Sequence, residues 1–149
     1  MEQELASIFS FVLKSADNPQ PYYTDIPQDF TVPSVYFPIP EITTCGDTFN
    51  TYGAEYDWYI KFFHSTTQAA YLLALKALTA IKENRNLIPL LDENGAKIGG
   101  IRIKDPELRI ADECAVQLTI RFVSRRPYIQ SNGPKSQDFA IDIKIKSDI

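Results

Sequence analysis

The sequence predicts an α+β fold, in which a mostly antiparallel sheet carries two helices packed on one face. Two segments have apolar residues at three- and four-residue spacing, as amphipathic helices do, and several others alternate apolar and polar residues, as half-buried strands do. The strands follow one another in pairs with the helices between them, which favours antiparallel pairing. The length of 149 residues, with 44% hydrophobic and 23% charged residues, is that of a single globular domain.

The first helix is predicted over residues 2–16, and Asp17-Asn18-Pro19 ends it. One face of this helix is apolar: Leu5, Ile8, Phe9, Val12 and Ala16. Residues 17–40 then hold six of the ten prolines together with five aromatic residues, which excludes a regular helix or a central strand and favours a segment docked on the rest of the protein. Within this segment, the alternation over 35–39 predicts an edge strand.

Residues 41–53 are rich in turn formers and are predicted to be an exposed polar loop. Residues 54–64 are the clearest strand, with an apolar face formed by Tyr56, Trp58, Ile60 and Phe62. Ser65, Thr66 and Thr67 offer caps for a second helix over 67–84. This helix is apolar nearly all round, so we expect it to be covered on more than one side.

The second half of the chain is predicted to be mostly strand. Residues 87–103 read as a hairpin around Asn94-Gly95, residues 108–111 extend the sheet weakly, and residues 114–124 form a long strand. A polar link over 125–137 precedes a last alternating segment, residues 139–145. We therefore treat residues 1–149 as one domain, with 129–149 forming an edge strand or an arm.

Charge is divided unevenly along the chain, although the net charge is only −4. Residues 1–60 have a net charge of −8, residues 61–96 of +1 and residues 97–149 of +3. An acidic front half and a basic back half favour self-association or a charged partner over catalysis.

The sequence offers no motif for catalysis, for a metal or for a cofactor. The two cysteines, Cys45 and Cys114, have neither metal-site spacing nor the pattern of a disulfide framework, and we expect both to be reduced. His64 is the only histidine, and nothing in the spacing pairs it with either cysteine. We expect no secretory signal and no membrane span, because no apolar stretch approaches the length of a bilayer crossing.

Arg121, Arg125 and Arg126 with Tyr128 form a basic patch beside an aromatic residue. DNA binding would require a more basic domain and a recognisable reading element, so we interpret this patch as facing solvent or a protein interface, where arginine is favoured.

Several segments together resemble the small tail terminator and tail-completion proteins of long-tailed bacteriophages. The resemblance covers residues 1–128 and lies in the order and texture of the elements: the N-terminal helix, Pro-Ser-Val-Tyr-Phe-Pro-Ile-Pro, Tyr-Asp-Trp-Tyr-Ile-Lys-Phe-Phe, the Ala/Leu-rich helix, the hairpin, and Ile-Arg-Phe-Val-Ser-Arg-Arg-Pro-Tyr. It implies a non-enzymatic virion protein of the tail end or neck, made in the bacterial host cytoplasm. Such proteins form rings, usually hexameric, that cap the tail tube and join it to the head connector.

The resemblance transfers no individual functional residue, so the interface residues come from charge and composition. A ring needs one surface patch to meet a different patch on the next subunit. We expect the arginines of the basic patch to meet acidic residues of a neighbour, and DNA to pass an acidic or neutral channel without specific binding. The expected interface residues are Arg121, Arg125, Arg126, Tyr128, Asp25, Asp29, Glu41, Asp47, Tyr36 and Phe37.

Two alternatives remain open from the sequence. One is another neck or adaptor component of the virion. The other is a small-ligand-binding or enzymatic α+β domain, with Tyr56, Trp58, Tyr59 and Phe63 lining a pocket.

Overall fold

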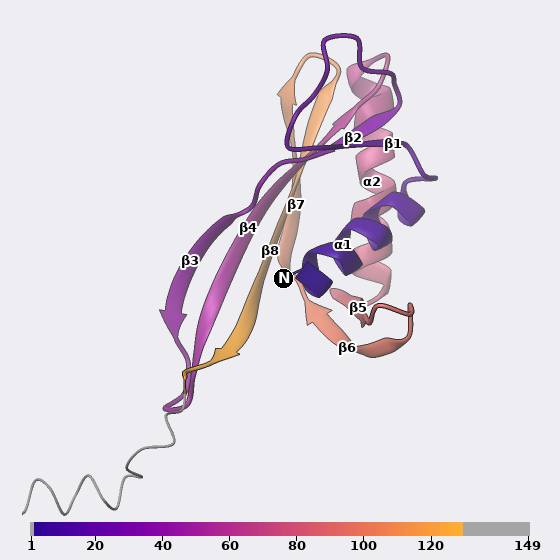
Figure 1. The fold of residues 1–149 in the computed structure, drawn as a ribbon. Coiled ribbons are helices and arrows are strands. Elements are labelled where there is room, and N and C mark those ends of the chain that lie inside the picture. Colours follow the sequence, from indigo (N-terminus) through magenta and orange to yellow (C-terminus); the bar gives the residue numbers. More distant parts are fainter. Residues whose placement is uncertain (1, 130–149) are drawn as a thin grey trace, which may run out of the picture.

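The computed structural model describes residues 2–129 of the chain, and it contains two helices and eight strands over that range (Figure 1). Their order is α1 (Glu2–Ser15), β1 (Gln20–Tyr23), β2 (Ser34–Phe37), β3 (Glu41–Gly46), β4 (Thr51–Phe63), α2 (Thr67–Glu83), β5 (Leu87–Leu91), β6 (Lys97–Arg102), β7 (Lys104–Asp112) and β8 (Ala115–Pro127).

Six strands form the main sheet in the order β1-β2-β4-β8-β7, and β3 pairs with β4 alongside β2. Only the β1–β2 pair is parallel, and the other pairs of this sheet are antiparallel. The two helices lie on one side of the sheet (Figure 1). The predicted α+β fold, with a mostly antiparallel sheet, is therefore confirmed.

Strands β4 and β8 are the longest in the sheet, with 13 residues each. They pair without interruption from Thr51 opposite Pro127 to Phe63 opposite Ala115. Figure 1 shows that the helices cover only part of this length, and that β3 and the adjoining parts of β4 and β8 project past them. We call the projecting part the blade (β3, residues 51–57 and residues 121–127) and the remainder the body.

The core lies between the sheet and the helices. The predicted apolar face of β4 is confirmed, because Tyr56, Trp58, Ile60 and Phe62 are all buried. Pairing with β8 places Phe122 opposite Tyr56 and Leu118 opposite Ile60 on the same face. The helices contribute buried apolar residues at the predicted spacing: Ile8 and Val12 from α1, with Ala16 directly after it, and Ala70, Leu73, Ala74, Ala77 and Ile81 from α2.

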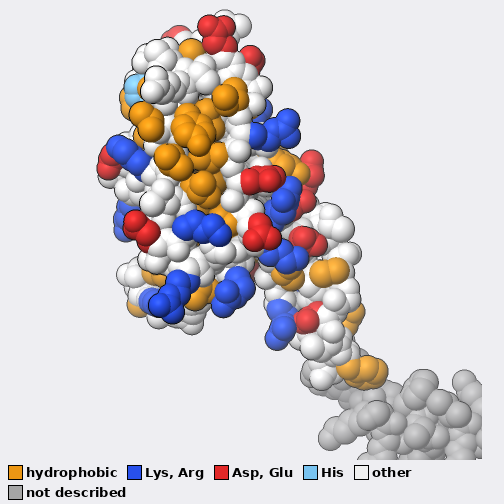
Figure 2. All heavy atoms as spheres, turned by 180° about the vertical axis from the view of Figure 1, so that it is seen from behind, with side chains coloured by type: hydrophobic (Ala, Val, Ile, Leu, Met, Phe, Trp, Pro, Cys, Tyr) orange, Lys and Arg blue, Asp and Glu red, His pale blue; other side chains and the backbone are white. Residues whose placement is uncertain are grey.

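Helix α2 begins as the sequence predicts, since Thr66 Oγ1 accepts a hydrogen bond from the Ala69 N–H at 3.1 Å. Its inner side packs on the sheet, and α1 lies beside it. The outer side of α2 keeps Tyr71 and Leu72 exposed, and Ile110 of the neighbouring β7 is exposed as well. Figure 2 shows hydrophobic side chains gathered on the body, with charged residues around them.

The segment of residues 41–53 is not a loop, and that prediction is wrong. Residues 41–46 form β3, a tight turn follows, and β4 already begins at Thr51. A strand does form near residues 35–39, but it ends at Phe37 and it is not an edge strand, because β2 lies between β1 and β4. Ile39 follows the strand and is exposed. Pro38 and Pro40 separate β2 from β3, so two short strands share one edge of β4.

The predicted hairpin is confirmed as β5 and β6, which form a separate two-stranded sheet. Its turn is closed by Asp92 Oδ1, which accepts hydrogen bonds from the N–H groups of Asn94 and Ala96, and Gly95 has a φ of 82°. The weak extension predicted over 108–111 is instead the nine-residue β7. Strand β8 continues to Pro127, whereas the sequence predicts a link from residue 125. The strand predicted over 139–145 lies outside the described residues.

Candidate assembly surface

The face of the sheet opposite the helices carries a row of paired charges. Residues 55, 57 and 61 of β4 point to this face because they alternate with the buried positions. Arg121 lies directly opposite Asp57 in the β4–β8 pairing, and its Nε is 3.4 Å from Asp57 Oδ1. Arg121 Nη2 lies 3.6 Å from Glu107 Oε1, and Lys104 Nζ lies 3.6 Å from Glu55 Oε1. Positive and negative side chains accordingly lie side by side from the body to the blade (Figure 2).

The remaining two arginines of the predicted patch lie on opposite faces of the blade. Arg125 Nε is 2.6 Å from Asp47 Oδ2, and the Thr51 hydroxyl donates a 2.8 Å hydrogen bond to the same carboxylate. Arg126 donates a hydrogen bond to the Tyr56 hydroxyl and lies 5.9 Å from the centre of that ring. The Tyr56 ring in turn stacks on Phe122, with ring centres 4.7 Å apart. Arg126 therefore covers the end of the core that is nearest the blade tip.

These contacts show that the acidic and basic halves of the sequence meet within one chain. Asp47, Glu55 and Asp57 belong to the acidic front, and their partners belong to the basic back. Exposed ion pairs of this kind contribute about 0–1 kcal/mol each, so they orient the side chains more than they stabilise the fold. A contact between the arginines and a neighbouring subunit stays a prediction.

The tip of the blade exposes aromatic side chains. Tyr128 follows β8, is half exposed, packs its ring on Tyr52 at 5.3 Å and donates its N–H to the Asn50 carbonyl at 2.9 Å. Phe49, in the turn between β3 and β4, is 94% exposed. Phe49 is not among the interface residues predicted from the sequence, where its one signal is a large apolar residue inside a run of turn formers.

The other predicted interface residues are spread over the molecule. Asp25 and Asp29 are exposed on the connection between β1 and β2, at the end of the molecule opposite the blade tip (Figure 1), and Glu41 is exposed at the start of β3. Tyr36 is partly buried and donates a hydrogen bond to the Thr24 carbonyl at 2.9 Å. Phe37 is only 2% exposed and packs in the core, so its assignment to a partner surface is corrected.

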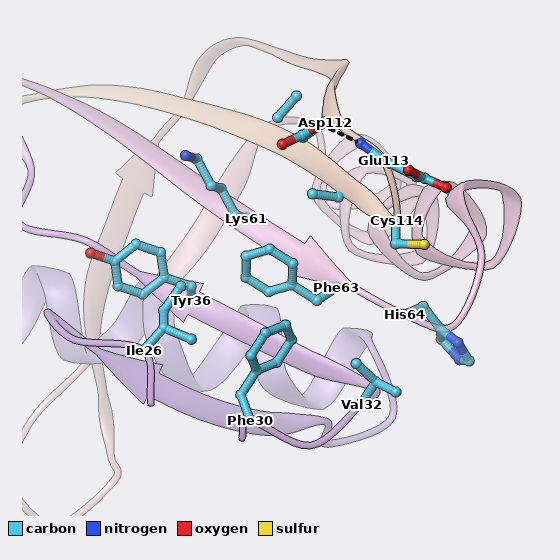
Figure 3. A pocket seen from close by; sticks show the side chains of 12 residues that line it. Ile26, Phe30, Val32, Tyr36, Lys61, Phe63, His64, Asp112, Glu113 and Cys114 are labelled. Carbon is cyan, nitrogen blue, oxygen red and sulfur yellow. Dashed lines mark hydrogen bonds between the residues drawn. The ribbon is translucent and has the colours of Figure 1, made fainter. Parts of the chain in front are cut away.

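The body also has a cavity at the end far from the blade (Figure 3). Its walls come from the β1–β2 connection, from β2, from the end of β4 and from the turn between β7 and β8: Ile26, Phe30, Val32, Tyr36, Lys61, Phe63, His64, Ala111, Asp112, Glu113, Cys114 and Ala115. The pocket suggested by the sequence is not this one. Tyr56 and Trp58 face the helices, whereas Tyr59 and Phe63 alternate onto the opposite face, so these four side chains cannot line one site.

The described residues show no arrangement for the chemistry considered from the sequence. The Cys114 thiol lies 3.4 Å from the Ser65 carbonyl, and His64 Nδ1 accepts a hydrogen bond from the Ser65 N–H at 2.8 Å, so over residues 2–129 no cysteine is paired with His64. No three His, Cys, Asp or Glu side chains in that range gather as a metal site would require. Neither helix in this part of the chain is long and apolar enough to cross a membrane.

The fold and its surfaces thus define an α+β protein with a projecting β-blade and a face of paired charges. No family model matches the chain. The phage-like element PBSX protein XkdJ of Bacillus subtilis (strain 168) is 35% identical over 147 residues, which cover 98% of this chain and 100% of that protein. The uncharacterized protein YqbJ of the same strain is 37% identical over 148 residues, which cover 98% of this chain and 100% of that protein.

The chain therefore belongs to the family of the phage-like element protein XkdJ, which confirms the predicted relationship to phage proteins. Among solved structures, a chain from the virion of a native gene transfer agent particle is similar, with a TM-score of 0.49 and 13% sequence identity over 83% of this chain and 93% of that chain.

Proposed function

We propose that the protein is a structural, non-enzymatic component of a phage-type particle, acting at the tail end or neck. In this role it assembles as a ring on the tail tube, ends polymerisation of the tube and joins the tail to the head connector. The observation that carries the proposal is the 35% identity, over nearly the whole chain, to a protein of a phage-like element. The sequence resemblance to tail terminator proteins supplies the more specific role.

The surfaces of the described residues suit contact with other proteins. The blade tip presents Phe49 and Tyr128 to solvent, and aromatic residues are enriched where protein interfaces form. In a ring, each subunit uses two different surfaces, one for each neighbour. The arginines of β8 and the acidic Asp25 and Asp29 lie far apart on the molecule, so they are suited to meet across a subunit boundary.

Purified protein, alone and mixed with the tail tube protein of the same particle, tests the proposal by native mass spectrometry and negative-stain electron microscopy. We expect closed rings, most simply hexamers, and shorter tubes when the protein is present during tube assembly. Deletion of the gene should give tails of uncontrolled length. A protein that stays monomeric with tubes and leaves their length unchanged would refute the role. Binding to the head connector alone would favour another neck position.

The intersubunit contact has its own test. Arg125→Glu breaks the pair with Asp47 and reverses the charge offered to a neighbour, so we expect smaller assemblies in light scattering. The double variant Asp47→Arg with Arg125→Glu restores an opposite-charge pair within the chain but keeps the surface reversal at residue 125. If the double variant assembles like the wild type, Arg125 acts only within its own subunit. Continued loss of assembly supports the neighbour contact.

A further inference from the structure

The outer edge of β3 is a free strand edge. Within the described residues, β3 pairs only with β4, and β1 occupies the corresponding outer position only beside β2. All six residues of β3 are exposed. A free edge presents unpaired N–H and C=O groups, which a further strand satisfies by adding to the sheet.

An apolar groove runs beside this edge on the helix side of the sheet. It has a volume of about 330 Å³, and its lining is almost wholly apolar: Leu5, Thr24, Pro38, Ile39, Pro40, Ile42, Tyr56 and Trp58. Ile42 points into the groove because it lies opposite Tyr56 in the β3–β4 pairing. Ile39 and Ile42 are 76% and 56% exposed. A strand added to β3 would place every second side chain over these residues.

The described chain ends near this edge. Strand β8 runs to the blade tip, and the Tyr128 N–H donates a hydrogen bond to the carbonyl of Asn50, in the turn that joins β3 to β4. The outer side of β3 is three strand positions from β8, which is about 14 Å at the usual strand spacing. The link over residues 130–138 spans up to about 30 Å when extended, so the following residues can reach it.

Residues 139–145 have the pattern that this edge requires. Phe139, Ile141, Ile143 and Ile145 alternate with Ala140, Asp142 and Lys144. If the segment runs antiparallel to β3 from the tip, Ile143 lies opposite Ile42, Lys144 opposite Glu41, and Ala140 opposite Cys45. This register puts the apolar side chains on the groove side and pairs opposite charges on the other face.

We propose that residues 139–145 add to the outer edge of β3 of the same chain as an antiparallel strand and fill the groove at Ile39 and Ile42 with their apolar side chains. The inference does not depend on the ring or on a role in a tail. It makes the blade four-stranded and covers the apolar groove between β3 and α1.

Cysteine cross-linking of the full chain tests the register. With Cys114→Ser, Cys45 is the remaining native thiol, and Ala140→Cys places a second thiol opposite it. We expect mild oxidation to give an intrachain disulfide, seen as faster migration of the monomer and confirmed by mass spectrometry. Ile141→Cys, one residue along and on the other face, is the matched control. Asp142→Cys detects a register shifted by two residues.

Cross-linked dimers, with no intrachain product, would show that the segment pairs with a neighbouring copy and would overturn the proposal. The absence of any cross-link from Ala140→Cys and Asp142→Cys would also overturn it.

Trp58 gives a second readout, because it lines the groove and is the only tryptophan. Ile143→Asn should increase acrylamide quenching of Trp58 and lower the thermal midpoint, because it removes an apolar side chain from the groove. Lys144→Asn, the neighbouring position on the opposite face, should leave the quenching at the wild-type level. Equal quenching in both variants and the wild type would refute docking in the groove.

Discussion

Gly53 lies where a side chain would be crowded by both neighbouring strands of the blade. It lies on β4 opposite Arg125 of β8 and Cys45 of β3. A Cβ atom at this position would lie 2.7 Å from Cys45 Sγ and 3.0 Å from Val123 Cγ1. The thiol can rotate away, but the branched Val123 side chain has little freedom at χ1. Replacement by alanine therefore requires the Cys45 thiol to rotate and Val123 to shift.

We expect Gly53→Ala to destabilise the protein by about 1–3 kcal/mol through overpacking. The alanine also lowers the entropy of the unfolded chain, and this effect raises the free energy of unfolding by about 0.4–1 kcal/mol. The net loss of stability, which is the overpacking cost less the entropic gain, lowers the melting temperature by roughly 2–4 °C per kcal/mol for a chain of this size. Urea unfolding followed by the fluorescence of Trp58, which is 5% exposed in the core, measures the free energy directly.

Gly46→Ala is the matched control, because a Cβ at that position of β3 meets nothing within 4 Å. It has the same effect on the unfolded chain and none on the packing, so the two variants differ by the clash alone. Cys45→Ala should restore part of the loss in Gly53→Ala, since it removes the closest atom. Equal stability of Gly53→Ala and Gly46→Ala would refute the close approach of β3, β4 and β8.

Three further changes have definite expected results, each measurable by urea or thermal unfolding. Phe122→Ala removes a fully buried ring that stacks on Tyr56, and should cost about 3–5 kcal/mol. Thr66→Ala removes the side chain that caps α2 and should cost about 1 kcal/mol, while Thr66→Ser should retain most of the stability. Asp17→Asn breaks the exposed ion pair with Lys76 and should cost less than about 1 kcal/mol, with the difference vanishing in high salt.

The sequence predicts those elements whose pattern is produced by burial on one side. Both helices, β4, β8 and the β5–β6 hairpin follow from alternation, helical spacing or turn residues. Strand β3 has no such pattern, because every one of its residues is exposed, and periodicity records burial rather than pairing. Strand β1 is short and contains Pro21, and β7 contains Pro106, so both resemble loops in sequence.

Among the predicted interface residues, local sequence could not separate surface from core or one face from another. Phe37 stands among aromatic neighbours in the sequence, but the β2–β4 pairing turns its side chain inward against Trp58, with ring centres 5.5 Å apart. The three arginines are close in sequence, but the β4–β8 pairing places Arg121 and Arg125 on one face of the sheet and Arg126 on the other. Arg125 meets Asp47, which is 78 positions away, and no local pattern encodes such a contact. The hydrophobic face of β4, by contrast, needed only its own thirteen residues.

The length of β4 and β8 has a mechanical consequence. Because the same two strands run from the blade tip to the far end of the body, the blade is continuous with the core and has no linker at its base. A pull along the strands at the tip acts as shear across thirteen paired positions. The hydrogen bonds between the strands then share the load and do not break one at a time. A force on the blade tip therefore acts directly on the two strands against which α2 packs.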